Sequence, residues 1–428
     1  MQIYVVAQGD TLYNIAMSYN TTVNAIVSAN ELPESDQLVV GQALVIPIVG
    51  NFYIVMRGDS LWAIAQRFGM DYLELARINN INPNSTIYPG LRLYIPPRVK
   101  TQAVSNAYIE PIGGQASTAL LTDARKAAPF LTYLAPFSYQ MRNDGTLQPL
   151  NLNGITEIAQ ANNNSLMMVI TNIQNGQFDG ELAKQVLESV AVQNLLIDNI
   201  IAEANRVGQF SDIHFDFEFI PANLRIPYTN FIRIATTRLH QAGFLVSVAL
   251  APKTSATQAG QWYEAHDYGA LGNIVDFVVI MTYEWGYSGG PPRPVSPINL
   301  VEQVLLYAIS EMPSTKILMG QNLYGYDWTL PYIAGGQYAK AVSPQLAIST
   351  AWQFNASILY DYIAQAPYFY YTNNGVQHIV WFEDARSIQA KFDLIKRLNL
   401  RGISYWKLGL PFPQNWLLLG DNFDIVKY

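Results

Sequence analysis

The nine residues SDIHFDFEF, at positions 211–219, indicate both how this chain folds and what it can do. Ionisable side chains occupy every second position, at Asp212, His214, Asp216 and Glu218, and the residues between them are apolar. Because successive side chains of a β-strand point to opposite faces, one face of this strand would carry three acids and a histidine. Burying so many acids is costly, so a purely structural strand is disfavoured.

Composition bounds the class of protein. The chain has 428 residues, half of them hydrophobic and 13% charged, which fits two or three domains with large cores. A net charge of −7 without a basic run predicts no nucleic-acid partner and no membrane-surface binding. The absence of cysteine excludes disulfides and thiolate metal sites. No secretory signal is expected at the N-terminus, and no apolar run reaches the roughly 18 residues of a membrane span.

The first hundred residues contain a repeat. The stretch YVVAQGDTLYNIA at 4–16 recurs as YIVMRGDSLWAIA at 53–65, and VGQALVIP at 40–47 recurs as PGLRLYIP at 89–96. The copies align without a gap at a period of 49 residues. Each copy is typical of strand, helix, helix, strand, with a Gly-Asp-Thr or Gly-Asp-Ser turn that can cap the first helix.

These repeats resemble the LysM family, and we expect one such module at 1–48 and a second at 51–97. The resemblance implies binding to runs of N-acetylglucosamine in peptidoglycan or chitin. It places the contacts in the turn residues Gly9, Asp10, Thr11, Gly58, Asp59 and Ser60. The alternative is that these residues only shape turns. Two weak sites on one tether would raise avidity through effective concentration.

The remaining residues, 104–428, are enough for a (β/α)8 TIM barrel, an α/β fold. Eight apolar, β-branched and aromatic runs are typical of buried parallel strands. They are 107–112, 130–137, 166–173, 213–220, 245–251, 275–285, 317–324 and 402–408. The gap between the last two strands is too long for one helix and contains a hairpin signal at Asn373-Asn374-Gly375. We therefore expect a small insertion between strands seven and eight, forming one wall of a cleft, and two small α+β (βααβ) LysM modules before the barrel.

In such a barrel, the stretch 211–219 is the fourth strand. Its apolar side chains, Ile213, Phe215, Phe217 and Phe219, are predicted to face the surrounding helices. The ionisable side chains would then point into the barrel, with Glu218 nearest the C-terminal mouth, where the active sites of this fold lie.

Neighbouring carboxylates suggest glycoside hydrolysis, with one acid kept protonated. However, Asp216 and Glu218 lie two apart on one strand, side by side, and cannot flank a sugar ring from opposite faces. A mechanism that fits this spacing uses the N-acetyl oxygen of the substrate as the nucleophile. Glu218 would protonate the leaving oxygen, and Asp216 would stabilise the acetamido group as positive charge builds on it.

Three stretches resemble glycoside hydrolase family 18, the chitinase-like barrels. DIHFDFE, at 212–218, resembles the family signature D-x-x-D-x-D-x-E, and MTYEW, at 281–285, resembles M-x-Y-[DN]. GISYWKLG, at 402–409, resembles the last strand of the family. The resemblance implies four roles: acid/base for Glu218, acetamido partner for Asp216, a hydrogen bond to the acetamido carbonyl for Tyr283, and stacking under the sugar for Trp406.

The chain departs from the family pattern at several positions. Ser211 and His214 stand where the family has aspartates, Glu284 replaces the usual Asp or Asn, and Asn322 stands where Pro is common. The catalytic pair is retained, so activity is expected with an altered set of groups beneath it. His214 is either a satisfied core histidine or part of a proton relay. We predict that Trp285, Glu284, Asn322 and Tyr324 contribute to substrate binding, and we expect no metal and no cofactor.

The whole arrangement resembles the spore cortex-lytic N-acetylglucosaminidases of endospore-forming bacteria. That resemblance implies retaining cleavage after N-acetylglucosamine in cortex peptidoglycan during germination, with peptidoglycan strands as the partner. It also implies placement at the spore coat–cortex boundary. Three alternatives are open: a chitinase, a non-catalytic glycan-binding protein, and a metal hydrolase, since His214, Asp216 and Glu218 share a face. The sequence leaves open exo or endo action and any requirement for muramic-δ-lactam.

Overall fold

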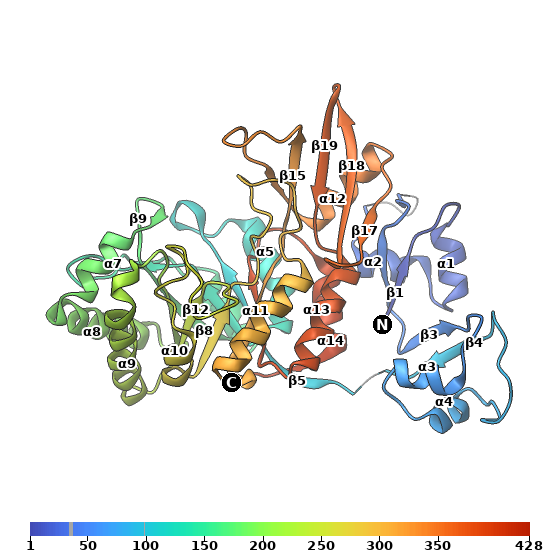
Figure 1. The fold of residues 1–428 in the computed structure, drawn as a ribbon, viewed down its shortest axis with the longest axis horizontal. Coiled ribbons are helices and arrows are strands. Elements are labelled where there is room, and N and C mark those ends of the chain that lie inside the picture. Colours follow the sequence, from blue (N-terminus) through green and yellow to red (C-terminus); the bar gives the residue numbers. More distant parts are fainter. Residues whose placement is uncertain (34–36, 98) are drawn as a thin grey trace.

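The computed structural model describes residues 1–33, 37–97 and 99–428 (Figure 1). Its main body is a closed barrel of eight parallel strands in the order β11-β12-β13-β14-β20-β5-β6-β8, and β8 pairs with β11 to complete the ring. The predicted (β/α)8 fold is confirmed. No helix in the described ranges is long and apolar enough to cross a membrane.

Each of the eight predicted runs overlaps one barrel strand. The strands are β5 (Thr101–Ile109), β6 (Tyr133–Pro136), β8 (Ser165–Thr171), β11 (Phe210–Asp216), β12 (Leu245–Leu250), β13 (Phe277–Ile280), β14 (Ile317–Asn322) and β20 (Gly402–Trp406). The bounds differ most for the first strand, which begins at Thr101 because β21 (Phe423–Ile425) pairs with its start. Short strands β7 (Tyr139–Gln140), β9 (Ile173–Gln174) and β10 (Gln177–Phe178) lie beyond the barrel ends.

Helices cover the outside of the barrel. They are α5 (Thr118–Ala127), α6 (Ile155–Ala161), α7 (Gly180–Leu187), α8 (Val190–Val207), α9 (Arg225–Gln241), α10 (Tyr268–Ile274), α11 (Ile298–Glu311), α13 (Ala385–Arg397) and α14 (Pro413–Asn422). The start of α8 is capped by the Ser189 hydroxyl, and its end by Gly208 in the left-handed region. The largest core cluster lies between these helices and the strands.

Two of the three phenylalanines at 215–219 pack against the helices as predicted. Phe215 meets Phe231 of α9 edge to face and Phe217 stacks on it, with ring centroids 5.5 and 5.9 Å apart. The prediction was wrong for Phe219, which is 39% exposed and stacks on Trp262. The strand ends at Asp216, and Phe219 has a φ of +54°, so the alternation of faces no longer holds there.

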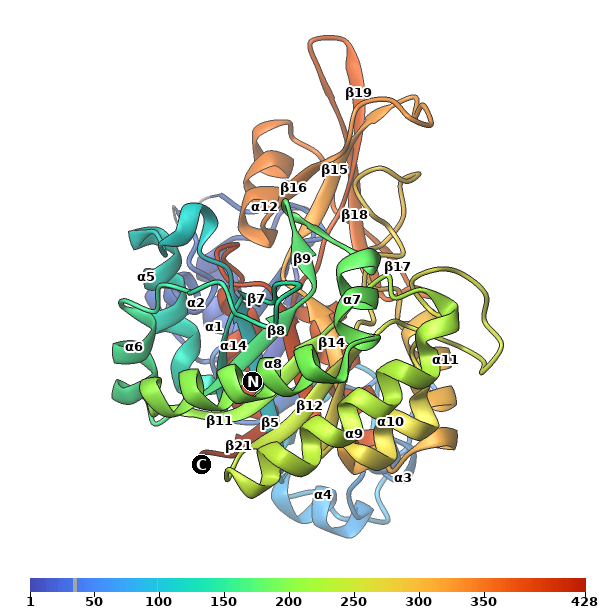
Figure 2. The ribbon, with the colours of Figure 1, turned by 90° about the vertical axis from the view of Figure 1, so that its left-hand side faces the viewer.

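An insertion between β14 and β20 forms an antiparallel sheet of five strands in the order β16-β15-β19-β18-β17. Its elements are β15 (Gly325–Leu330), β16 (Lys340–Val342), α12 (Pro344–Gln353), β17 (Leu359–Asp361), β18 (Ala366–Asn373) and β19 (Val376–Trp381). The predicted hairpin is β18–β19, joined by Asn374 and Gly375, both with positive φ. Figure 2 shows β15, β18 and β19 rising above one end of the barrel.

Two βααβ modules precede the barrel, as predicted. Module 1 contains β1 (Gln2–Val5), α1 (Leu12–Ser18), α2 (Val23–Asn30) and β2 (Ala43–Ile46). Module 2 contains β3 (Asn51–Ile54), α3 (Leu61–Arg67), α4 (Tyr72–Ile78) and β4 (Arg92–Ile95). Each module has its own small core. Figure 1 places module 1 beside the insertion and module 2 at the edge of the molecule.

Candidate active site

The four ionisable side chains of the opening stretch are all buried. Asp212 and His214 are fully buried, Asp216 is 5% exposed and Glu218 is 8% exposed. Asp216 is the last residue of β11, and Glu218 follows it beyond the strand. The acids therefore continue along the chain toward the C-terminal mouth of the barrel, as the alternation predicted.

His214 is held by hydroxyl groups on both sides of its ring. Its Nδ1 lies 2.7 Å from Ser247 Oγ, and its Nε2 lies 2.9 Å from the Tyr108 hydroxyl. The Ser247 hydroxyl donates to Asp212 Oδ2 at 2.6 Å. Burial lowers the pKa of His214 to about 3, so the imidazole is neutral. Both ring nitrogens have hydrogen-bond partners, which the core-histidine and the proton-relay alternatives both require.

Asp216 and Glu218 form a coupled pair of buried acids. Burial raises the pKa of Asp216 to about 7. Burial, and then the neighbouring Asp216 carboxylate, raise the pKa of Glu218 well above its ordinary value. Such a pair holds one proton near neutral pH, and Glu218 is the stronger candidate to carry it. Asp216 Oδ1 is buried without a hydrogen-bond partner among the residues that the structure describes, so one acceptor beside the protonated acid is free.

Two residues that the sequence did not single out hold Glu218 in place. Asn172, just after β8, accepts the Glu218 backbone N–H at 2.9 Å and donates to its carbonyl oxygen at 2.9 Å. Trp262 donates from Nε1 to Glu218 Oε2 at 2.5 Å. Its loop is anchored by His266, which donates from Nε2 to the Phe217 carbonyl at 3.0 Å. The one signal in the sequence that Asn172 belongs to the site was its position at the end of a strand, where the active-site residues of this fold lie.

Tyr283 and Glu284 follow β13 at the mouth. Tyr283 is 8% exposed, and burial, with nearby Tyr108 and the acid pair, raises the pKa of its phenol. The hydroxyl therefore stays protonated and can donate. Glu284 accepts hydrogen bonds from the hydroxyls of Tyr324 and Tyr326, and burial raises the pKa of its carboxyl. Tyr283, Tyr324 and Tyr326 belong to one cluster with aromatic residues of the insertion, which is the predicted wall.

Of the predicted tryptophans, only Trp406 lies with the cleft cluster. It ends β20, borders both that cluster and the barrel interior, and packs against Phe137 with centroids 4.8 Å apart. Trp285 packs instead on the large core cluster under the helices. Its contribution to substrate binding stays a prediction.

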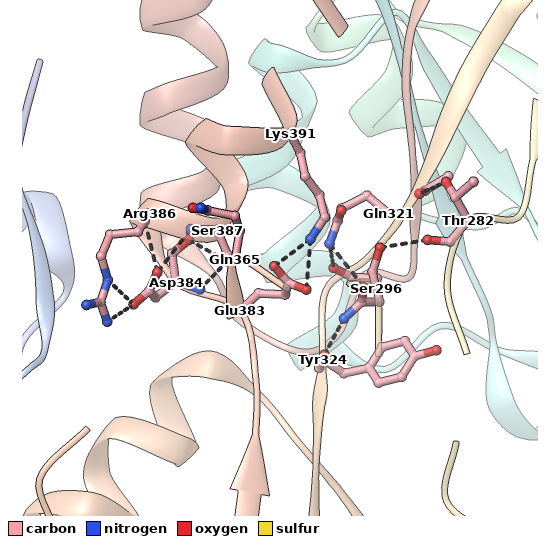
Figure 3. A network of polar contacts seen from close by, with 12 residues as sticks. Thr282, Ser296, Gln321, Tyr324, Gln365, Glu383, Asp384, Arg386, Ser387 and Lys391 are labelled. Carbon is pink, nitrogen blue, oxygen red and sulfur yellow. Dashed lines mark hydrogen bonds and ion pairs between the residues drawn. The ribbon is translucent and has the colours of Figure 1, made fainter. Parts of the chain in front are cut away.

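Asn322 is fully buried at the end of β14. Its side chain donates to the Tyr324 carbonyl at 2.6 Å and accepts from Gln321 Nε2 at 3.0 Å. It therefore supports the backbone that carries Tyr324, and direct substrate contact stays a prediction. Figure 3 shows Gln321 and Tyr324 within the polar network at this position.

The same network fixes the insertion where the chain returns to the barrel (Figure 3). Lys391 Nζ and Glu383 Oε2 form an ion pair of 3.1 Å, with side chains 0% and 2% exposed. Nearby, Ser296 donates to the Thr282 carbonyl at 2.6 Å, and Thr282 donates to the Gly320 carbonyl at 2.7 Å. The ion pair therefore joins the end of the insertion to α13, and the two hydrogen bonds join the segment after β13 to β14.

In the modules, the predicted contact residues shape turns. Asp10 accepts from the Tyr4 hydroxyl at 2.7 Å, and Asp59 accepts from the Tyr53 hydroxyl at 2.7 Å. The hydroxyls of Thr11 and Ser60 cap α1 and α3, and Gly9 and Gly58 have positive φ. These observations favour the turn-shaping alternative for the side chains, and glycan contact by this set stays a prediction.

The metal-hydrolase alternative would need at least three ligand side chains gathered in the part of the chain that the structure describes. No group of three or more acidic, histidine or cysteine side chains is placed to hold an ion among those residues. His214, the nitrogen donor of the metal-hydrolase alternative, has hydroxyl partners on both ring nitrogens.

Comparisons with known proteins show the family and the fold. The Glycosyl hydrolases family 18 profile matches residues 107–410, and the LysM domain profile matches 4–47 and 53–96. The Cortical fragment-lytic enzyme of Bacillus subtilis (strain 168) is 58% identical over 428 residues, covering 100% of this chain and 99% of the relative. The crystal structure of the spore cortex-lytic enzyme SleL of Bacillus megaterium QM B1551 has a TM-score of 0.91 at 49% identity, covering 100% of this chain and 99% of that one. A chitinase of Chromobacterium violaceum ATCC 12472 shares the fold, with a TM-score of 0.67 at 24% identity, covering 75% of this chain and 98% of that one.

Proposed function

Since the chain belongs to the glycosyl hydrolases of family 18 and carries two LysM domains, we propose that it is an N-acetylglucosaminidase of spore cortex peptidoglycan. It cleaves glycan strands during germination with retention at the anomeric carbon. The observation that carries the proposal is the buried Asp216–Glu218 pair at the barrel mouth, which holds a protonated acid beside a free acceptor.

In the first step, the Glu218 proton passes to the glycosidic oxygen as the bond from that oxygen to the anomeric carbon breaks. The carbonyl oxygen of the acetamido group forms a new bond to the anomeric carbon, giving an oxazolinium intermediate. Asp216 accepts the acetamido N–H and balances the positive charge that develops there. The Tyr283 hydroxyl donates to the acetamido carbonyl oxygen and holds it in line with the anomeric carbon.

In the second step, the Glu218 carboxylate takes a proton from water, and the water oxygen attacks the anomeric carbon. The bond to the acetamido oxygen breaks, and the product is a reducing N-acetylglucosamine with the original configuration. Asn172 holds the Glu218 backbone and Trp262 holds the Glu218 carboxyl through both steps. Two displacements at one carbon account for retention.

Peptidoglycan strands of the cortex are the proposed partner, and the spore coat–cortex boundary is the proposed location. The names of the relatives most similar over the full length refer to cortical fragments and spore cortex lysis. Chitin offers the same N-acetylglucosamine to the catalytic subsite, but the chitinase named above is only 24% identical to this chain.

The test is mass spectrometry of borohydride-reduced products from purified spore cortex and from chitin oligomers. We expect reduced N-acetylglucosamine ends from cortex and little turnover of chitin. Reduced muramic acid ends would contradict the proposed bond, and preferential chitin cleavage would favour a chitinase. The length distribution of early products separates exo from endo action.

A further inference from the structure

The two modules are built alike but packed differently against the rest of the chain. A shift of 49 residues superposes their sequences, so Val39 corresponds to Tyr88 and Gly41 to Gly90. Val39 is 4% exposed, whereas Tyr88 is 70% exposed. The difference lies in the segment before the last strand of each module, and it follows from what covers that segment.

In module 1 this segment is covered by the insertion. The Ile358 N–H donates to the Val40 carbonyl at 2.9 Å, and Arg386 donates to the Gly41 carbonyl at 3.0 Å. A Cβ on Gly41 would lie 1.9 Å from the Ile358 carbonyl oxygen, so the two backbones are in direct contact. Val39 packs in one core cluster with insertion residues that include Val342, Ile358, Phe369, Val380 and Phe382.

Module 1 also shares the core of the barrel. Gln414 of α14 donates to Asn30 Oδ1 at 2.7 Å and to the Ala43 carbonyl at 2.9 Å. Asn30 and Gln414 are 1% and 2% exposed. Ala43 and Val45 of β2 belong to the same cluster as the residues between the barrel strands and helices. Shared core packing of this kind holds a module in one position relative to the barrel, whereas a flexible tether would not.

Module 2 leaves the corresponding segment open. A Cβ on Gly90 would meet no atom of the described residues within 4 Å, in contrast to Gly41. The described contacts of module 2 run mainly to module 1: the Phe52 N–H donates to Gln2 Oε1 at 2.8 Å, and the Phe52 ring lies 6.4 Å from Tyr19.

The open segment adjoins the Gly-Asp-Ser turn. Gly90 N donates to the Val55 carbonyl, and Val55 N donates to the Leu91 carbonyl, both at 2.8 Å. The segment that carries Tyr88 therefore runs beside the start of the turn. Met56, Trp62 and Tyr88, which we call the module 2 face, are 56%, 61% and 70% exposed. Exposed aromatic rings with a polar tip are suited to stack on sugar rings.

We propose that module 1 is a fixed structural part of the catalytic unit, and that module 2 alone holds the enzyme on insoluble glycan through the module 2 face. The occupant is an N-acetylglucosamine-containing strand, so the inference rests on the proposed function. Retention then comes from one site rather than from two. Deleting residues 1–97 would also remove Ala43 and Val45 and uncover the barrel residues that pack on them, so a truncation cannot test it.

The test is cosedimentation with purified cortex sacculi, with Glu218→Gln in every protein so that the glycan is not degraded. We expect Trp62→Ala with Tyr88→Ala to weaken binding at least tenfold. The matched control is Tyr13→Ala, since Tyr13 corresponds to Trp62 and is 65% exposed in module 1. It should change binding less than twofold. Equal losses in the two modules, or none in module 2, would overturn the inference.

Tyr88→Val provides a second test in case the double variant misfolds. It introduces valine, the residue that module 1 has at the corresponding position, Val39. It should also weaken retention while leaving the circular dichroism spectrum unchanged. On the unsubstituted background, both module 2 variants should hydrolyse short soluble cortex fragments at the normal rate. Normal cleavage with unaltered retention would reject only this inference, whereas no cleavage by the unmodified chain would reject the proposed function.

Discussion

The hydrogen bond from Trp262 to Glu218 gives the sharpest test of the site. Trp262→Phe removes the N–H donor that lies 2.5 Å from Glu218 Oε2 and keeps an aromatic ring against Phe219 and Tyr263. That donor favours the ionised carboxylate, so its loss favours the protonated acid. A hydrogen bond to a charged group contributes about 1.5–3 kcal/mol, and Glu218 is only 8% exposed, so water screens little of it.

The sign of the effect follows from the role of Glu218. The acid must be protonated to assist the leaving group, so activity falls as pH rises through its pKa, which burial and Asp216 already hold above the ordinary value. Removing the donor raises that pKa further. The basic limb of the kcat/KM profile should therefore move to higher pH by about one to two units, at about 1.4 kcal/mol per unit. The other ionisable groups near Glu218, namely Asp216, Tyr108 and Tyr283, are unchanged.

The assay is the initial rate of cleavage of soluble cortex fragments as a function of pH, for Trp262→Phe and for Phe219→Leu. The second variant alters the stacking partner of Trp262 and keeps the donor, so its basic limb should stay in place. A Trp262→Phe enzyme that is slower at every pH, with an unmoved basic limb, would refute the reasoning and leave Trp262 a packing residue.

Three further predictions concern catalysis and the framework. Asp216→Asn should lower kcat by about 100- to 1000-fold on soluble fragments, because the oxazolinium loses its counter-charge; near-normal turnover would exclude the substrate-assisted mechanism. Gly41→Ala should lower the free energy of unfolding, measured in urea, by about 1–3 kcal/mol more than Gly90→Ala does. Both glycines have positive φ, so backbone strain affects both variants, but of the two only Gly41 abuts another backbone. Equal losses would contradict the docking of module 1. Lys391→Met should cost about 3–5 kcal/mol by the same measurement, because Glu383 is left buried without its partner, and adding Glu383→Gln should restore part of that loss.

The features that the sequence predicted are those set by local periodicity. Buried parallel strands are apolar throughout, so each of the eight runs stood out, and a period of two placed Asp216 and Glu218 on the inner face. Asn172 and Trp262 were missed because they lie 46 and 44 residues from Glu218, and only closure of the barrel brings them to it. Phe219 was misplaced because nothing local shows that the strand ends at Asp216.

The repeat shows a different limit of sequence reasoning. The two modules align without a gap because their cores are built from similar residues. The alignment therefore predicts the same fold for both, and it also suggests the same role. Their roles depend on surface positions such as Val39 and Tyr88. Whether such a position is exposed depends on the insertion, which lies about 300 residues further along the chain. The insertion also supplies Tyr326 to the wall of the cleft. One small sheet therefore holds module 1 and borders the active site, so module 1 is fixed relative to the catalytic acids. Module 2 contacts module 1 through Phe52 and directly precedes β5 in the chain, so a strand bound on the module 2 face is held beside the same unit that carries those acids.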